Sequence, residues 1–505
     1  MFPRGVLIPT ALASLMLTRL KVSGFKNLRN VDVSLGPFTC IAGPNASGKS
    51  NLFDAIAFLS YLADGTLMEA ASRVRGDRSR SFDPRNLFHR IGDTTESTMR
   101  FEVEMIVPPE GTDSLGQMAQ ATTTFLSYKL ALGLRQSRSI DHGSEIEVLF
   151  EELDRIKVGD APNHVRFPHA KRWLSSVISG RRQQPFISTE EEKKGTIVKI
   201  HQDQRSGRKR ELLATHLPRT ALSSADAAET PTAVLARQEM ESWRELQLEP
   251  SALRHPSNFR DARTLGMDGS NLAATVAHLE TTAEAEASGR GQDVLAQLAN
   301  RLSALIDDVG GVRVHRDETR EMITVLVQDR LGTEHPARSL SDGTLRFLAL
   351  SVLDADPRFK GVLCLEEPEN GIHPDRIQPM LSLLRDIAVD VEEPVGPDNP
   401  LRQVVINTHS PSVVANVQDD ELLMAVQVLH RGEKGHTPGA AFRWLSKTWR
   451  VEQDPEVHTV SRGLLVSYLS PHQDEEERAS PAGTSARPRV KEREDIRQLR
   501  LPLVG

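Results

Sequence analysis

The 505-residue sequence has few aromatic residues, only two cysteines and no long uninterrupted apolar run. Aromatic residues make up 5%, so we expect a core built mainly from Leu, Ile, Val and Ala. Two cysteines exclude a disulfide framework, and Cys40 and Cys364 lie in apolar runs that predict reduced core thiols. No run reaches the roughly 18 apolar residues of a membrane span. These absences predict a cytoplasmic protein that does not enter the membrane.

The chain also lacks an excess of positive charge. Its net charge of −7 argues against a uniformly basic nucleic-acid binder but permits local basic patches. Two clusters have this composition: Arg73, Arg75, Arg78, Arg80, Arg85 and Arg90, and Arg205, Arg208, Lys209 and Arg210. Such clusters bind phosphate backbones, and solvated loops look the same in sequence. Nucleic acid is therefore a candidate partner, and the alternative of solvated loops stays open.

The first informative stretch begins after a short N-terminal segment. "LTRLKVSGFKNL" and "NVDVSLG" alternate apolar and polar residues and predict two half-buried strands. "FTCIA" is continuously apolar and predicts a fully buried strand. "NLFDAIAFLSYLAD" has helical spacing and predicts a helix that ends at Gly65. The opening "MFPRGVLIPTALASLML" faintly resembles a signal peptide, but prolines interrupt it, and Met16 is an alternative start.

Between that strand and that helix lies "GPNASGKS", Gly43 to Ser50, which matches G-x-x-x-x-G-K-[ST]. Glycines allow backbone N–H groups to wrap phosphates, and the following helix directs its positive end at them. Lys49 supplies a charge to the β and γ phosphates, and Ser50 can ligate Mg²⁺. A structural glycine turn would not require the Lys-Ser pair. The pattern therefore predicts a nucleotide phosphate site.

A second carboxylate-bearing motif is "LCLEEPENGIHP", residues 363–374. Glu366 and Glu367 follow a buried strand, and adjacent strand residues point to opposite faces, so they are expected to have different roles. One can hold the Mg²⁺ of a nucleotide, and the other can polarise an attacking water. A solvated strand end is the alternative. Glu rather than Asp at position 366 adds one methylene of reach, which a bridging water can offset.

Two polar turns complete the pattern. "SLSDGT" opens a helix in "LRFLALSVL", and "THS" places His409 directly after the buried strand "QVVIN". Ser341 and the amides at that helix start can form a second anion site, with a plain helix cap as the alternative. A lone histidine is usually structural, so a functional role for His409 is indicated only together with the neighbouring motifs.

Together, "GPNASGKS", "LSDGT", "LCLEEPENGIHP" and "NTHSP" resemble the ABC-type ATPase head of the SMC, RecF and OLD group. The resemblance is strongest to stand-alone bacterial "AAA family" ATPases, many of them encoded in anti-phage defence loci. It covers about 16–66 and 300–417, is vague over 67–299 and is absent from the tail. It implies an α/β fold of the P-loop NTPase class: an ABC-type head with a mixed β-sheet flanked by helices, plus an inserted α/β lid or arm region.

The resemblance also implies roles for individual residues. Glu366 matches the Walker B carboxylate that holds Mg²⁺ with Ser50, and Glu367, His409 and Lys49 match catalytic positions. The signature is Ser341, Asp342 and Gly343, in which Asp342 replaces a glycine. The implied ATP contacts are Gly43, Pro44, Asn45, Ala46, Ser47, Gly48, Lys49, Ser50, Asn51, Ser341, Asp342 and Gly343.

The resemblance leaves two parts of the family pattern unassigned. The Q-loop glutamine has no clear match, and Gln183 and Gln184 are candidates only by elimination. OLD-type proteins carry a Toprim nuclease after the head, but the residues after "THSPSVVANVQDDELLMAV" contain no D-x-D at a strand end. We therefore expect no nuclease centre in this chain, and we expect "QDDE" and "EEEKKG" to be surface charge runs.

The expected organisation has five segments: an extension over 1–15, a Walker A lobe over 16–66, a β-subdomain with an inserted lid or arm over 67–299, a second lobe over 300–470 and a disordered tail over 471–505. In such heads two copies sandwich two ATP molecules. The resemblance thus implies an ATP- and Mg²⁺-dependent ATPase switch that pairs with itself and acts with an effector such as a nuclease in anti-phage defence. A RecF-like DNA-repair ATPase is the alternative, and a transporter ATPase subunit fits less well.

Overall fold

The computed structural model describes residues 16–74, 82–92, 94–136, 144–203, 209–286, 291–432, 435–453 and 458–469. The extension expected over 1–15, the tail expected over 471–505, and Arg75, Arg78, Arg80, Arg205 and Arg208 of the basic clusters lie outside these residues. The chain divides into one unit over Met1–Val460 and another over Ser461–Gly505. The domain boundaries expected at 66 and 299 stay predictions.

A six-stranded sheet in the order β14-β19-β20-β3-β21-β22 carries the phosphate loop. Its strands are β3 (Phe38–Ala42), β14 (Arg244–Leu246), β19 (Gly361–Glu366), β20 (Arg402–Thr408), β21 (Leu422–Gly432) and β22 (Gly435–Trp444). All neighbours are parallel except β21 and β22. Every residue of β3 and β20 is buried, as their continuous apolar runs predict. The parallel strands bring the motifs at their carboxyl ends to one edge of the sheet.

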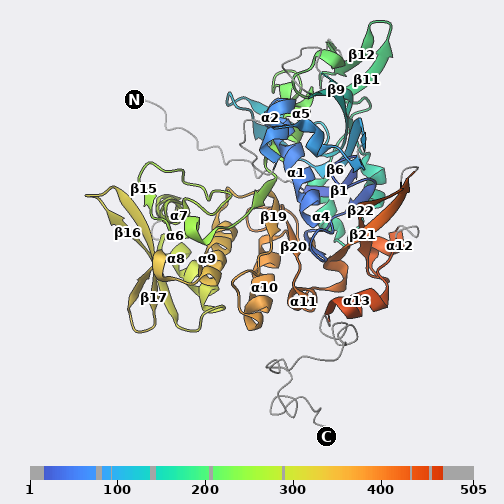
Figure 1. Ribbon diagram of the computed structural model, residues 1–505. Helices are drawn as coiled ribbons and strands as arrows, with labels where there is room; N and C mark the ends of the chain where they lie inside the picture. Colours follow the sequence, from blue (N-terminus) through green and yellow to red (C-terminus); the bar gives the residue numbers. More distant parts are fainter. Residues whose placement is uncertain are drawn as a thin grey trace, which may run out of the picture. The chain divides into compact units, whose positions relative to one another are not determined.

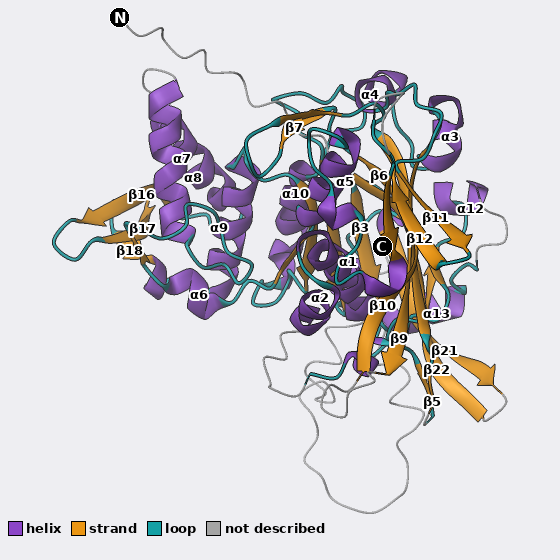
Figure 2. Cartoon of the chain, turned by 90° about the horizontal axis from the view of Figure 1, so that it is seen from above, coloured by secondary structure: helices purple, strands orange, loops and turns teal. Residues whose placement is uncertain are grey.

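An antiparallel sheet of eight strands lies in the same unit, in the order β13-β12-β11-β10-β9-β6-β1-β2 (Figure 2). Its strands are β1 (Met16–Ser23), β2 (Val31–Ser34), β6 (Thr98–Ile106), β9 (Phe125–Gln136), β10 (Ser144–Arg155), β11 (Ile187–Glu192), β12 (Gly195–Ile200) and β13 (Arg210–Leu213). The alternating runs "LTRLKVSGFKNL" and "NVDVSLG" predict β1 and β2, and the strand-like runs "TMRFEVEMIV", "TTFLSYKLALGL" and "EIEVLFEEL" predict β6, β9 and β10. The structure confirms these strands.

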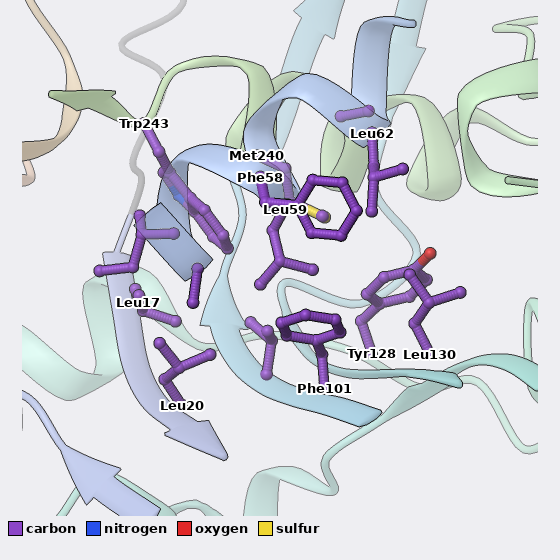
Figure 3. Packing of buried hydrophobic residues seen from close by; sticks show 14 of the residues in the cluster. Leu17, Leu20, Phe58, Leu59, Leu62, Phe101, Tyr128, Leu130, Met240 and Trp243 are labelled. Carbon is purple, nitrogen blue, oxygen red and sulfur yellow. The ribbon is translucent and has the colours of Figure 1, made fainter. Parts of the chain in front are cut away.

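Helix α1 (Lys49–Asp64) joins the two sheets through one hydrophobic core. Figure 3 shows Phe58 and Leu59 of α1 among Leu17 and Leu20 of β1 and Phe101 of β6. The rings of Phe58 and Phe101 lie 5.9 Å apart between centroids. The predicted stop at Gly65 is confirmed, because its N–H donates to the carbonyl of Tyr61 at 2.8 Å. Packing on the core therefore fixes the helix that follows the phosphate loop.

A third sheet contains β15 (Ser257–Asn258), β16 (Val309–Asp317), β17 (Met322–Asp329) and β18 (Glu334–Pro336). Figure 1 shows three helices beside it, α7 (Leu272–Glu286), α8 (Gly291–Ser303) and α9 (Asp342–Ala355). The runs "NLAATVAHLETTAEAEA", "QDVLAQLANRLSALIDDV" and "LRFLALSVL" predict these helices, and "VRVHRD" and "EMITVLVQD" predict a strand pair. The structure confirms them. Helix α9 carries the "SDGT" motif at its start, so this sheet and its helices support the signature.

One predicted helix is shorter than expected. The run "TPTAVLARQEMESWRELQL", residues 230–248, predicts a single helix, but α5 (Pro231–Glu241) ends early and the chain continues as β14. The Trp243 side chain is buried and its Nε1–H donates to Glu239 at 2.7 Å, which fixes the turn. Parallel pairing with β19 then satisfies the backbone of residues 244–246. Tertiary pairing has overridden helical propensity here.

Further α-helices and strands of the unit Met1–Val460 are α2 (Leu67–Arg73), β4 (Arg90–Ile91), β5 (Thr94–Thr95), β7 (Glu110–Thr112), β8 (Met118–Gln120), α3 (Ala161–His164), α4 (Lys171–Val177), α6 (Pro250–Arg254), α10 (Ile377–Ile387), α11 (Pro411–Val414) and α12 (Trp449–Gln453). The second unit contains α13 (Arg462–Leu469). No helix in the described ranges combines the length and hydropathy needed to cross a bilayer. Cys40 and Cys364 are buried and unbonded, so the prediction of core thiols is confirmed.

Candidate nucleotide site

The phosphate loop runs from β3 to α1 and requires glycine at two points. At Gly43 an added Cβ would lie 2.3 Å from the carbonyl oxygen of Ala425 on β21. At Gly48 φ is 98°, and an added Cβ would lie 2.4 Å from the Cβ of Ala440 on β22. Ala46 also has a positive φ, 63°. The loop is therefore wedged against β21 and β22, a constraint that the motif alone does not reveal.

Lys49, the first residue of α1, points back over this loop. Its ammonium group donates to the carbonyls of Gly43 at 2.7 Å and Pro44 at 2.9 Å. Burial lowers the pKa of Lys49, and the carboxylates of Glu367 and Glu366 act in the opposite direction. The charge of Lys49 thus interacts with both the phosphate loop and the two glutamates.

Glu366 ends β19 and lies between two amide side chains. Its Oε1 accepts from Asn407 Nδ2 at 3.3 Å, and its Oε2 accepts from Gln247 Nε2 at 3.3 Å. Gln247 directly follows β14, the edge strand beside β19. Gln183 and Gln184, the candidates by elimination, lie in the loop between α4 and β11. The glutamine that contacts Glu366 is therefore Gln247.

Glu367 has a different set of partners. Its Oε1 accepts from His409 Nδ1 at 2.6 Å, and its Oε2 accepts from Asn370 Nδ2 at 2.9 Å. Partial burial acts to raise the pKa of Glu367, but the bonds from Asn370 and His409 outweigh it, so the pKa lies below the usual value. Its backbone φ of 44° is rare for a residue with a side chain. Such backbone conformations cluster at functional sites.

Further hydrogen bonds hold the backbone of Glu367 and the end of β20, just before His409. The N–H of Glu367 donates to both the carbonyl and the side-chain oxygen of Asn407, each at 3.1 Å. Thr408 links β20 to the phosphate loop, because its carbonyl accepts from the N–H of Gly43 at 3.3 Å. The Thr408 hydroxyl donates to Glu369, whose pKa is raised by burial. Glu366 and Glu367 thus lie in different environments because each has its own hydrogen-bond partners.

The signature residues occupy another surface of the same unit. Ser341 caps α9 by accepting from the N–H of Thr344 at 3.2 Å, as its position before the helix predicts. At Gly343 an added Cβ would lie 2.5 Å from the carbonyl oxygen of Gly371, in the turn after Walker B. Asp342 forms an ion pair with Arg254 of α6. The signature therefore packs against the "ENG" turn.

A cleft of about 360 Å³ collects most, but not all, of the predicted site. Its lining consists of Asn27, Asn45, Ala46, Ser47, Gly48, Lys49, Ser50, Asn51, Glu366, Glu367 and Asn407. Asn27 and Asn407 were missed by the sequence reading. Asn407 ends the apolar run "QVVIN", one residue before the end of β20, so the signal that marks Glu366 also applies to it. Asn27 accepts from Asn51 Nδ2 at 2.7 Å, and nothing in the sequence marks it. Ser341, Asp342 and Gly343 do not line this cleft.

The cleft has the donor set that ATP and Mg²⁺ require. The Ser47 hydroxyl is buried there without a hydrogen-bond partner among the described residues, which suits a loop that wraps an anion. In the described part of the chain, no three His, Cys, Asp or Glu side chains form a metal cage. Ser50 and Glu366 would suffice as protein ligands for Mg²⁺, because this ion usually keeps waters and binds substrate phosphates.

The charged runs give a mixed result for nucleic acid. Arg73 lies 4.2 Å from the ring centroid of Tyr61, and Arg85 pairs with Asp83 at 2.8 Å. Arg90, Lys209 and Arg210 are exposed. In "EEEKKG", Glu190 and Glu192 pair with Lys199, each at 2.7 Å. In "QDDE", Glu421 is bound by Arg385 at 2.7 Å. Among the described residues of the two basic clusters, Arg90, Lys209 and Arg210 thus remain available for a phosphate backbone.

Comparison with known proteins identifies one matching family and local similarities to two curated proteins. A family model described as "AAA domain, putative AbiEii toxin, Type IV TA system" matches residues 38–113 and 112–415. A DNA replication and repair protein RecF from Erwinia tasmaniensis is 36% identical over 63 residues, 12% of this chain and 18% of that protein. An OLD nuclease from Thermus scotoductus is 49% identical over 41 residues, 8% of each. The chain thus spans less than a fifth of either curated relative.

Solved SMC head domains are similar at low identity. An SmcHead bound to the C-winged helix domain of ScpA is 12% identical with a TM-score of 0.43, covering 86% of this chain and 99% of that one. The SMC head domain from Thermotoga maritima is 11% identical with a TM-score of 0.34, covering 86% and 100%. The family match spans most of the chain and includes the phosphate loop, both glutamates and His409. This chain belongs to the family described as "AAA domain, putative AbiEii toxin, Type IV TA system", and it has local similarity to RecF and OLD proteins.

Proposed function

We propose that this chain is an ATP-hydrolysing switch whose sites are completed when two copies pair around ATP and Mg²⁺. One observation carries the proposal. The phosphate loop, Glu366 and Glu367 line one cleft, whereas Ser341, Asp342 and Gly343 lie outside it. The start of α9 has the free amides that can bind an anion but does not line the cleft of its own copy, which is explained if it serves the cleft of another copy.

The roles within one cleft follow from the contacts. Lys49 and the loop amides bind the β and γ phosphates, and Ser50 and Glu366 hold Mg²⁺, which neutralises phosphate charge. Glu367 orients and polarises the attacking water, because its carboxylate is ionised and fixed by His409 and Asn370. Gln247 contacts Glu366 from β14 and links the metal ligand to the edge of the sheet. ATP hydrolysis therefore depends on the Glu367 carboxylate, whose orientation the fold already fixes.

The switch is proposed to act with an effector protein, such as a nuclease, in anti-phage defence. The local similarity to an OLD nuclease supports this setting. Contact with nucleic acid would use the exposed Arg90, Lys209 and Arg210. The similarity to RecF favours the alternative, a DNA-repair ATPase. DNA binding by the isolated protein that is stimulated by ATP and weakened by salt would support repair over a switch that needs a protein partner.

The test compares wild type with Glu367→Gln, which keeps the shape of the side chain and removes its charge. Wild type should hydrolyse ATP, while Glu367→Gln should bind ATP, pair in a manner visible by light scattering, and hydrolyse at least about 100-fold more slowly. Glu318→Gln, in the exposed turn between β16 and β17, is the matched control. Hydrolysis by Glu367→Gln at the wild-type rate would show that the base is another residue.

A further inference from the structure

Asp342 raises an electrostatic problem for the proposed pairing. It is the first residue of α9, where an acid stabilises the helix dipole. The same position would face the γ-phosphate of ATP held by another copy. Two negative groups at such a contact repel each other, and the repulsion grows as water is excluded. A compensating cation is therefore required if Asp342 belongs to a working signature.

Arg254 of α6 provides that cation. Its Nη2 group pairs with Oδ1 of Asp342 and also donates to the carbonyl of Leu340 at 3.1 Å. The Arg254 and Asp342 side chains are 32% and 50% exposed, so the pair lies at the surface where a second copy would arrive. The Nε and Nη1 groups of Arg254 have no hydrogen-bond partner among the described residues. Arg254 thus neutralises the charge of Asp342 and still has N–H groups that can donate to a further acceptor.

The position of Arg254 is fixed by its neighbours. The preceding residue, Leu253, is 1% exposed, and its N–H donates to the carbonyl of Glu249 at 3.0 Å. Gly269 packs so closely that an added Cβ would lie 2.6 Å from the side chain of Leu253. Because Leu253 is anchored, Arg254 is held at the start of α9. Its contact with Asp342 is therefore a built feature of α6 and not a chance meeting of two flexible side chains.

We propose that Arg254 is a positioning residue of the signature: it neutralises Asp342 and holds the Leu340 turn, so that the start of α9 can receive the γ-phosphate of ATP bound by a second copy. The inference rests on the proposed function. It adds to that function a residue far from the "SDGT" motif in sequence. It also gives the acid in the signature a defined electrostatic partner.

The first test is a rescue experiment on the full chain. Arg254→Ala should lower kcat at saturating ATP by at least about tenfold, with the Kd for ATP unchanged, because the cis cleft is intact. Asp342→Asn added to Arg254→Ala should restore most of the rate, because the unpaired negative charge is gone. Arg320→Ala, at a position 79% exposed in the β16–β17 turn, is the control and should keep the wild-type rate. A double variant as slow as Arg254→Ala would overturn the proposal.

The second test asks whether Arg254 acts on the site of the other copy. Lys49→Ala copies lack a working phosphate loop but keep Arg254, and Arg254→Ala copies have the reverse defect. Mixing the two slow proteins should raise the rate, because one site of each mixed pair is then complete. No recovery, in a mixture shown by light scattering to pair with ATP, would overturn the proposal. A wild-type protein that neither pairs nor hydrolyses ATP would instead contradict the proposed function.

Discussion

The Nδ1 atom of His409 lies 2.6 Å from Oε1 of Glu367, while Asn370 occupies the other carboxylate oxygen. The two contacts fix the plane of the carboxylate and favour its charged form. Glu366, one residue earlier, contacts Asn407 and Gln247 instead. Two neighbouring glutamates thus have separate partners, which is the physical basis for assigning one to metal and the other to water.

Replacement of His409 by Ala should slow hydrolysis without weakening ATP binding. The carboxylate of Glu367 would keep Asn370 but lose its second restraint, so kcat should fall by about tenfold or more while KM changes little. His315→Ala, on an exposed position of β16, is the control. The measurement is steady-state ATPase kinetics. A change in KM alone would mean that His409 helps to bind ATP and does not act in the hydrolysis step.

Replacement of Gly48 by Ala should destabilise the protein and abolish ATP binding. The φ of 98° and the 2.4 Å approach to Ala440 leave no room for a methyl group. Strain and repacking should cost about 2 kcal/mol or more in the free energy of unfolding. Gly396→Ala is the control, because nothing lies within 4 Å of its added Cβ. Thermal denaturation with and without ATP measures both effects, and equal behaviour of the two variants would contradict the strain argument.

Replacement of Gln247 by Ala should raise the Mg²⁺ concentration needed for half-maximal hydrolysis by about tenfold. Residues that orient a metal ligand commonly have effects of this size, and Gln247 donates to Glu366 at 3.3 Å. Gln183→Ala and Gln184→Ala should leave the Mg²⁺ dependence unchanged. If either of these variants changed it and Gln247→Ala did not, the assignment from geometry would be wrong.

Glu239 should make stability fall as pH rises. The side chain is 0% exposed, and burial raises its pKa from 4.5 to about 8. The folded state therefore holds a proton that the unfolded state has lost, so the stabilisation is complete below about pH 4.5 and is lost as pH rises through 8. The slope is on the order of 1 kcal/mol per pH unit in this window.

The Glu239→Gln variant tests this titration. The amide cannot ionise and its oxygen can still accept from Trp243, so the pH dependence of Tm between about 5 and 8 should flatten relative to wild type. Glu318→Gln should leave the dependence unchanged. An unaltered slope in Glu239→Gln would mean that other groups control the pH dependence.

The cleft could be predicted largely from sequence because its parts are local. Gly43 to Ser50 are contiguous, and the alternation or continuity of apolar residues placed β3, β19 and β20 before the motifs. Parallel strands then bring Glu366 and His409 to one edge of the sheet without further information. The signature helix was predictable for the same reason, since Ser341 caps an apolar run.

Gln247 and Arg254 could not be predicted, because their roles depend on contacts distant in sequence. Gln247 lies 119 residues from Glu366 and meets it only because β14 pairs with β19. The apolar spacing of residues 230–248 is helical, so the sequence predicts a helix where the structure has β14. Arg254 lies 88 residues from Asp342, and nothing near either residue indicates the ion pair.

The phosphate loop, the two glutamates, the histidine and the buried strands that precede them are predictable from short runs of residue types. Which amide holds Glu366, why Gly48 tolerates no side chain and how Asp342 is neutralised become visible only in the folded chain. These relationships arise where strands pair and helices pack, and the energy of such contacts depends on partners that no local window of sequence contains.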